Sequence, residues 1–259
     1  GDATVAVSST ASALFDNPNA FSSAGNHNLT LQGGLNPDGA GTITGAIALG
    51  SGGITKLQGG QWVLSGANTY TGTTNIAAGT ISASNIVVQG GASNLGNATS
   101  PVMLGGATST GTLLYTGQAA TYTRGFNIEA GGGRIEYTNL GETLTIASSG
   151  ITGTAGNLTV AGAGDLHVAS DINLGTGSLT KTGVGVLNLA GTNTYSGATT
   201  IDGGLVILTG TLDATATVSI TGSLRLGASD RIVDTANLIG ETGGTLYADS
   251  FNETLGTLD

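Results

Sequence analysis

Short bursts of alternation between apolar and polar residues run along most of the chain. A period of two residues is the pattern of a β-strand with one buried face, so each burst predicts a strand of about three to five residues. Glycine, asparagine, aspartate, serine or threonine follows most bursts and indicates a turn. The clearest bursts are the pairs Leu29/Leu31, Ile47/Leu49, Trp62/Leu64, Ile86/Val88, Val102/Leu104, Phe126/Ile128, Leu144/Ile146, Leu158/Val160, Leu166/Val168, Leu187/Leu189, Val218/Ile220 and Leu224/Leu226.

The spacing of these bursts separates two all-β architectures. Between Leu158 and Leu187 the predicted strands begin only six to eight residues apart, closer than the intervals of about 8–12 residues that are typical of a β-sandwich. Three such strands would close one coil in roughly 22 residues, and each strand would pair with its counterpart in the next coil about 4.8 Å away. We therefore predict an all-β fold, a right-handed parallel β-helix (β-solenoid) with about three short strands per coil and about 12 coils. The pattern itself leaves the handedness of the coil open.

The N-terminal stretch departs from this pattern. Residues 9–26 (STASALFDNPNAFSSAGN) show no sustained alternation and contain a proline. We expect residues 1–27 to form a cap or an irregular lead-in, and residues 28–259 to form a single elongated β-solenoid. Because the chain begins Gly1-Asp2-Ala3-Thr4, without the basic and apolar regions of a signal peptide, we take it for a mature product or a piece of a longer protein.

An internal repeat favours a fold of stacked coils. Residues 52–81 align without gaps with residues 177–206 at an offset of 125 residues, and 13 of the 30 positions are identical. Similar strings upstream, Asn28-Leu-Thr-Leu and Asn157-Leu-Thr-Val, extend the two related units to about residues 28–81 and 157–206. Repetition over so long a period is expected of a stacked rod. The shared positions that we single out are Lys56, Gly66, Asn68, Tyr70 and Gly72, with their counterparts Lys181, Gly191, Asn193, Tyr195 and Gly197.

The two aligned blocks resemble the autotransporter-associated β-strand repeat, also called the passenger-associated transport repeat. The shared core is Gly-x-[Ile/Leu]-Thr-Lys followed by Leu-x-Gly-x-Asn-Thr-Tyr-x-Gly-x-Thr-x-Ile-x-x-Gly, from Gly52 to Gly79 and from Gly177 to Gly204. The resemblance implies the passenger region of an autotransporter, whose β-helix crosses the outer membrane of a Gram-negative-type cell unfolded and stacks outside. It also implies an extracellular or cell-surface location, with an outer-membrane-anchored parent, and a role of the repeat in export and folding.

Composition narrows the function classes further. The 259 residues include 47 glycines and no cysteine, and only 8% are charged and 4% aromatic. So few charged helix-forming residues argue against a helical bundle, and a mean hydropathy of +0.21 argues against disorder. The net charge is −10 and the six basic residues are scattered, so we expect no nucleic-acid partner. No apolar run is long enough to cross a membrane, so we expect no membrane insertion. A narrow interior should favour Val, Ile and Leu over aromatic side chains.

We expect the shared repeat positions to have structural roles. Lys56 and Lys181 have the parity of inward residues, but burying an unpaired ammonium is costly. We therefore expect the strand to end before each lysine, which would lie at a corner. Asn68 and Asn193 are expected at turns, with amide ladders between coils. The tyrosine of each repeat is expected to pack over the turn with its hydroxyl in water, and an exposed ring that stacks on carbohydrate is the alternative.

Catalytic chemistry finds little support in the sequence. Glycan-active β-helices need paired carboxylates, and the nearest approaches are Asp165 with Asp171 and Asp230 with Asp234. The chain has two histidines, and the alternation around His167 places it outward, where it is expected at the surface. We predict that the chain is not an enzyme, with no catalytic, cofactor-binding or metal site and no cofactor.

The sequence thus predicts a structural, non-enzymatic β-solenoid segment of a secreted or cell-surface protein that acts as a stalk, scaffold or adhesive surface. Candidate partners are a second copy of the chain, in head-to-tail or lateral assembly, and a glycan or protein at another surface. Two alternatives stay open. One is a subunit of an extracellular fibre that assembles through exposed solenoid ends, and the other is a β-helical glycan-active enzyme.

Overall fold

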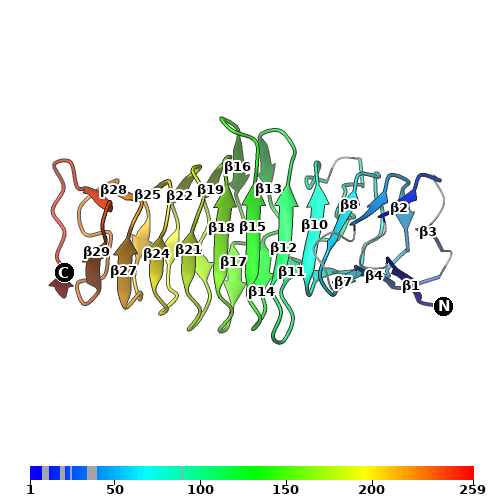
Figure 1. The fold of residues 1–259 in the computed structure, drawn as a ribbon, viewed down its shortest axis with the longest axis horizontal. Coiled ribbons are helices and arrows are strands. Elements are labelled where there is room, and N and C mark those ends of the chain that lie inside the picture. The colour runs from blue at the N-terminus through cyan, green and yellow to red at the C-terminus, as the bar shows by residue number, and fades with distance from the viewer. Residues whose placement is uncertain (8–11, 18–20, 24, 34–39, 89) are drawn as a thin grey trace.

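The strands of the chain stack along one axis into a rod. The structure is a computed structural model, and it describes residues 1–7, 12–17, 21–23, 25–33, 40–88 and 90–259. Within these ranges every regular element is a β-strand, and the two termini lie at opposite ends of the rod (Figure 1). Successive coils pair in parallel throughout the described sheets, as in β12 with β15. The predicted all-β, parallel β-solenoid is therefore confirmed, while its right-handed sense stays a prediction.

The strands of the coils form three faces of the rod, which we number one to three in the order in which the chain reaches them. Face one consists of β1 (Ala3–Ala6), β4 (Leu29–Gln32), β7 (Ile54–Leu57), β9 (Thr74–Ile76), β11 (Val102–Leu104), β14 (Phe126–Ile128), β17 (Ile151–Gly153) and β20 (Ile172–Asn173). It is continued by the pair β23 (Thr192–Asn193) and β26 (Thr211–Leu212), because Thr194 N donates to Ile172 O of β20 over 3.0 Å.

Face two carries the longest sheet of the described residues, with 12 strands. They are β2 (Ser12–Phe15), β5 (Ala40–Ile43), β8 (Gln61–Leu64), β10 (Gly79–Ala83), β12 (Gly111–Tyr115), β15 (Gly133–Tyr137), β18 (Leu158–Gly162), β21 (Leu179–Lys181), β24 (Thr199–Ile201), β27 (Thr217–Ile220), β29 (Asn237–Gly240) and β31 (Thr257–Leu258). This sheet runs without interruption from one end of the described rod to the other (Figure 1).

Face three is divided into two parts. A pair, β3 (Phe21–Ser22) and β6 (Ile47–Ala48), lies near the N-terminal end. The larger part is β13 (Ala120–Tyr122), β16 (Thr143–Ile146), β19 (Asp165–Val168), β22 (Val186–Leu189), β25 (Leu205–Leu208), β28 (Ser223–Leu226) and β30 (Thr245–Tyr247). Between the two parts the chain runs through a longer coil, which carries residues 84–100.

Two successive coils without a strand on face three produce this division. From β12 onward, the steps between register partners on face two are 19 to 25 residues long, close to the predicted coil. The step from Gly79 of β10 to Gly111 of β12 takes 32 residues. The described residues of 84–100 form no third strand, and residues 65–73 of the preceding coil form none either, so the sheet of face three begins anew at β13.

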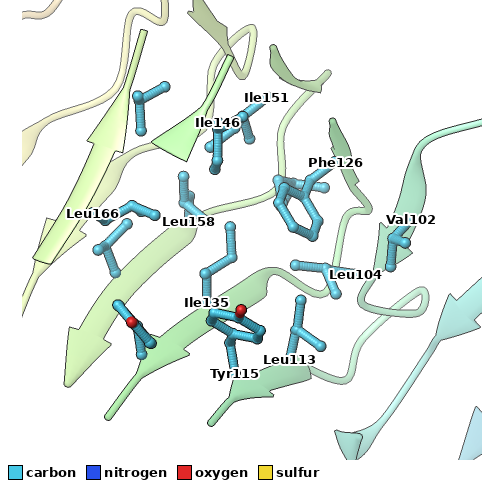
Figure 2. Close-up of a cluster of buried hydrophobic side chains, with 14 of the residues drawn as sticks. Val102, Leu104, Leu113, Tyr115, Phe126, Ile135, Ile146, Ile151, Leu158 and Leu166 are labelled. Carbon is cyan, nitrogen blue, oxygen red and sulfur yellow. The ribbon is translucent and has the colours of Figure 1, made fainter. Parts of the chain in front are cut away.

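Inward side chains from the three faces form one apolar core along the rod. Leu113, Ile135 and Val160 are successive register partners on face two and are all buried. Figure 2 shows such residues meeting across the interior, with Phe126 and Leu104 of face one opposite Leu113 and Ile135 of face two. Each buried Leu, Ile or Val contributes about 1.5–3 kcal/mol relative to an exposed position, so repetition of the same layers stabilises the rod.

Aromatic side chains are more frequent in this core than we expected. Trp62 is fully buried and lies against its register partner Gly41, where a Cβ atom would overlap the indole ring. Tyr115 and Tyr137 are also buried partners, with ring centroids 5.1 Å apart. Gly117 lies against the Tyr115 ring in the same way. The expectation of a core poor in aromatic residues is thus corrected, because glycines in contact with the rings leave room for them.

The described part of residues 1–27 contributes strands to the rod. β1 and β2 pair in parallel with β4 and β5, and β3 pairs with β6. Of the irregular run at residues 9–26, positions 9–11, 18–20 and 24 lie outside the described residues. The division into a lead-in and a solenoid stays a prediction.

The two sequence repeats occupy different faces. In the first, β7 and β9 lie on face one, and β8 and β10 lie on face two. In the second, the equivalent strands β21 and β24 lie on face two, and β22 and β25 lie on face three. Five steps on face one lead from β7 to β20, and β21 is the next strand along the chain. The second repeat is therefore displaced by five coils and one face.

Candidate functional site

The lysine of each repeat lies inside the rod. Lys56 belongs to β7 and is fully buried. Its Nζ donates hydrogen bonds to the main-chain oxygens of Leu57 (2.9 Å), Gln58 (2.7 Å) and Gly59 (2.9 Å) at the following corner. A fourth bond, 3.1 Å long, reaches Ala78 O in the next coil. The ammonium thus joins two coils through a ring of carbonyl oxygens.

Lys181 of β21 repeats this arrangement. Its Nζ donates to Thr182 O (2.8 Å) and Gly183 O (2.9 Å) at the corner and to Gly203 O (3.4 Å) in the next coil. Burial lowers the pKa of both ammonium groups to about 8. The expectation that each strand ends before its lysine is wrong, because the carbonyl ring supplies the partners whose absence would make a buried ammonium costly.

The last glycine of the motif closes this lysine site. Gly79 and Gly204 both have φ of +68°, a backbone conformation that side chains rarely adopt. A Cβ atom there would lie 2.7 Å from Lys56 Nζ or 2.9 Å from Lys181 Nζ. Lysine and glycine therefore occur together in the motif because the ammonium occupies the space beside the glycine.

The asparagines bind the main chain of both neighbouring coils. Asn68 Oδ1 accepts a hydrogen bond from Ile47 N (2.8 Å), and Asn68 Nδ2 donates to Asn94 O (2.6 Å). The same atoms of Asn193 bind Ile172 N (3.1 Å) in the preceding coil and Thr211 O (2.9 Å) in the following coil. Both asparagines are buried. The expectation of turn positions with amide ladders is wrong, because Asn193 lies in β23 and Asn68 forms a bridge with Ser93. Both asparagines link coils through main-chain groups.

The tyrosines of the repeats are core residues. Tyr70 and Tyr195 are fully buried, and each hydroxyl bonds a threonine four residues later, Thr74 at 2.8 Å and Thr199 at 2.7 Å. Burial raises the pKa of Tyr70 to about 12 and raises that of Tyr195 as well. The expectation of a hydroxyl in water is wrong, and so is the alternative of an exposed ring. The threonine supplies a buried partner that makes an inward tyrosine favourable.

The remaining glycines of the motif are points of close contact between coils. A Cβ atom on Gly66 would overlap Gly45 O, and one on Gly191 would overlap Ser170 O. At Gly72 and Gly197 the same atom would overlap the main chain of the preceding coil. Only glycine fits at these positions. All ten repeat positions therefore have a structural explanation in the stacking of coils.

One polar cluster was missed by sequence reasoning. Asn94, in the longer coil, accepts bonds at Oδ1 from Ser84 N (3.0 Å) and Asn85 N (2.7 Å) and donates from Nδ2 to Gly66 O (2.9 Å). Buried Arg124 donates to Leu95 O at 2.7 Å and anchors the same coil from the C-terminal side. Since the residues around Asn94 show no alternation, the sequence offers no signal that it is buried.

The acidic residues separate into two groups. Asp165 and Asp171, one of the pairs considered in the sequence, accept bonds from different main-chain amides of the next coil, Val186 N (2.7 Å) and Thr192 N (2.8 Å). The structure therefore gives the two carboxylates separate roles as caps of the following coil, while His167 lies half-buried on the outer side of β19.

The other acidic pair lines a surface hollow. Asp230, Asp234 and Asp213 surround it together with Arg231, and it measures about 380 Å³. All three carboxylates belong to exposed residues. In the described ranges, no group of three or more His, Cys, Asp or Glu side chains is arranged to hold a metal ion, and none of the elements is a helix that could span a membrane.

Comparison with known proteins identifies the repeats. Residues 54–83 and 179–208 match the family model of the passenger-associated transport repeat, which covers β7 to β10 and β21 to β25. Over 138 residues, or 52% of the chain, the sequence is 36% identical to a protein described as "Adhesin BmaC autotransporter" from Brucella suis biovar 1 (strain 1330). The chain spans about 3% of the length of that protein. No solved structure matches the chain.

Proposed function

We propose, from the premise that this chain carries two passenger-associated transport repeats, that it is a rigid spacer and scaffold within the passenger of a surface adhesin. In this role the rod is non-enzymatic and lies outside the cell. It holds other parts of the passenger at a distance from the membrane and exposes its lateral faces to the surroundings.

The observation that carries this proposal is the uninterrupted parallel sheet of face two. Its strands connect one end of the described rod to the other, from β2 to β31. At both repeats, buried lysine and asparagine side chains add hydrogen bonds between coils to those of the sheet. A spacer must resist bending and unfolding between its ends, and links between every pair of neighbouring coils favour that property.

Removal of a whole coil tests the spacer role. In the surface protein that contains this segment, deletion of residues 158–178 joins Asn157 to Leu179, which is the register partner of Leu158. The remaining coils keep their register, so we expect normal surface display and unchanged adhesion. Deletion of residues 158–168 removes about half a coil and is the matched control. It shifts the later inward residues away from the axis, and display should fall sharply.

Antibody labelling of intact cells measures display, and attachment to host cells measures adhesion. Equal display of the two deletion variants would contradict the stacking of coils as the basis of the rod. Full display with lost adhesion in the whole-coil variant would show that residues 158–178 themselves bind a target, and the spacer role would be wrong for them.

The two alternatives from the sequence stay predictions. Head-to-tail assembly into a fibre is tested by sedimentation of the purified chain at increasing concentration, where a monomer throughout would exclude it. The glycan-active enzyme is tested through the hollow beside Asp230 and Asp234, because loss of both carboxylates must abolish any glycan cleavage that the chain performs.

A further inference from the structure

A groove opens on the outer side of the first repeat. It measures about 410 Å³, within the range of about 300–1,000 Å³ that is typical of small-molecule sites. The groove begins at the corner that precedes face one and continues over β7, β9 and β11. Its lining includes Asn28, Gly53, Thr55, Asn75 and Met103.

The lining is polar but carries no charge. Thr55, Asn75 and Met103 are successive register partners on face one, so their side chains form one row across the groove. Asn28 is held in place, because its Oδ1 accepts a hydrogen bond from Gly53 N over 3.0 Å. Hydroxyl and amide groups thus surround a single thioether, Met103, which offers an apolar contact.

Asn75 provides the most specific feature of this row. Its Oδ1 is buried and has no hydrogen-bond partner among the described residues. A buried acceptor without a partner is unfavourable. Asn75 is itself a lining residue of the groove, and a ligand hydroxyl that reaches this oxygen would satisfy it.

The second repeat is an internal comparison. The counterpart of Asn75 is Thr200, and the strand that follows presents Ser219 in the same row. At the corner, Ser178 replaces Gly53, and its Oγ bonds Asn157 Oδ1 over 2.9 Å. The two repeats are alike inside the rod and differ on this outer surface. Stacking of coils therefore does not require an asparagine and a methionine here.

We propose that this groove binds a neutral carbohydrate, as one or two sugar units of a surface glycan. Amide and hydroxyl groups pair with the adjacent hydroxyls of a sugar, and the Met103 side chain contacts the apolar side of the ring. The net charge of −10 opposes binding of sialylated or sulfated glycans. This binding role goes beyond the spacer function and is independent of it.

An array of neutral, sialylated and sulfated oligosaccharides, probed with the purified full chain, tests the proposal. The neutral oligosaccharide with the strongest signal is then titrated in solution against the chain and its variants. The double variant Asn75→Thr/Met103→Ser gives the first repeat the outer row of the second, and we expect at least tenfold weaker binding. Thr180→Ala, at the counterpart of Thr55, is the matched control and should bind like the unaltered chain.

Circular dichroism and thermal unfolding establish that each variant is folded. Asn75→Ala alone, which leaves Met103 in place, is the second variant and should also bind at least tenfold more weakly. Absence of neutral glycans among the ligands, a preference for acidic glycans, or unchanged affinity of a folded Asn75 variant would each overturn the proposal.

Discussion

The buried ammonium group of Lys56 is surrounded by main-chain carbonyl oxygens, which are its hydrogen-bond acceptors. Lys56 Nζ contacts four main-chain oxygens at 2.7–3.1 Å, three from its own corner and one from the next coil. Hydrogen bonds to a charged donor contribute about 1.5–3 kcal/mol each when made and leave a large penalty when lost. Each lysine therefore fixes the conformation of a corner and its distance from the next coil.

The two lysines should make stability depend on pH in a defined window. Their pKa is about 8 in the folded chain and about 10.4 in an unfolded chain. Between these values the unfolded chain binds more protons, so the free energy of unfolding rises with pH. We expect the unaltered chain to gain about 1 kcal/mol or more over the variant Lys56→Met/Lys181→Met between pH 7 and 9.5.

Urea denaturation of both proteins at several pH values measures this difference. The series stops at pH 9.5 because the unfolded chain begins to lose tyrosine protons near pH 10, while burial raises the pKa of Tyr70 to about 12 in the folded chain. A difference in stability between the two proteins that falls or stays constant across the window would contradict the expected pKa shift.

The asparagines should be individually important for stability. Replacement Asn193→Ala removes the acceptor of Ile172 N and the donor to Thr211 O, both between coils. The main-chain groups that remain are buried, so we expect a loss of about 1–3 kcal/mol in the free energy of unfolding. Urea denaturation provides the measurement, and Asn252→Ala, at an exposed position, is the control. Equal stability of the two variants would show that the asparagine bonds between coils contribute nothing.

At the scale of single residues, the sequence predicted positions better than environments. Alignment of the two repeats singled out ten positions that lie at contacts between coils or beside the buried lysine, and parity placed Lys56 inward. The prediction then ended the strand before the lysine and placed it at a corner, because the carbonyl ring depends on a corner conformation that the residue types do not indicate. Gln58 has a φ of +62° at this corner, and the residue types around it do not predict this conformation. Likewise, the buried partner of Tyr70 is a threonine on the next strand, which ordinary alternation does not distinguish from other threonines.

The strands and corners show a division of roles between side chains and glycines. Inward side chains fill the core, while glycines at the corners bring the main chains of neighbouring coils into contact. At Gly66 and Gly191 a Cβ atom would overlap a carbonyl oxygen of the preceding coil. The spacing between coils at these points is therefore set by the absence of a side chain.

Alanine at these glycines tests this division. Gly66→Ala and Gly191→Ala each force the neighbouring main chains apart, and we expect a loss of about 1–3 kcal/mol from overpacking. Gly240→Ala is the control, since its nearest neighbour would be Asp259 O at 3.7 Å, and it should change stability by less than about 0.5 kcal/mol. Thermal unfolding ranks the three variants, and a control as unstable as the other two would refute the argument.

Most elements with strict alternation were predicted well, but the strand expected at Ile86/Val88 is wrong, because both residues lie outside the strands in the longer coil and Val88 is exposed. Pairs such as Leu158/Val160 and Leu166/Val168 lie in the strands β18 and β19. Within residues 84–100, burial depends on Asn94, whose bonds to distant main-chain groups have no periodic signal. Tertiary hydrogen bonds replace a strand there, so the sequence pattern could not reveal where face three is divided.

Protection of main-chain amides from hydrogen exchange should be greatest in the middle of the rod and should decrease toward both ends. Each coil is stabilised by contacts with its two neighbours, so a central coil opens only when those contacts are lost. We expect the slowest hydrogen exchange in β12, β15 and β18 of face two and faster exchange in β1 and β30. Mass spectrometry of deuterated peptides measures the gradient, and uniform protection along the rod would mean that it unfolds as one unit.

The displacement of the second repeat by one face has a consequence for any longer array. In a series of such units at the same 125-residue interval, the equivalent outer surface of each unit would lie one face further around the axis than that of the unit before it. Units that are three intervals apart would present the same surface on the same face. A binding surface present in each unit would then occur on all three faces of the rod. It would be accessible to a target in any rotational orientation of the rod about its axis.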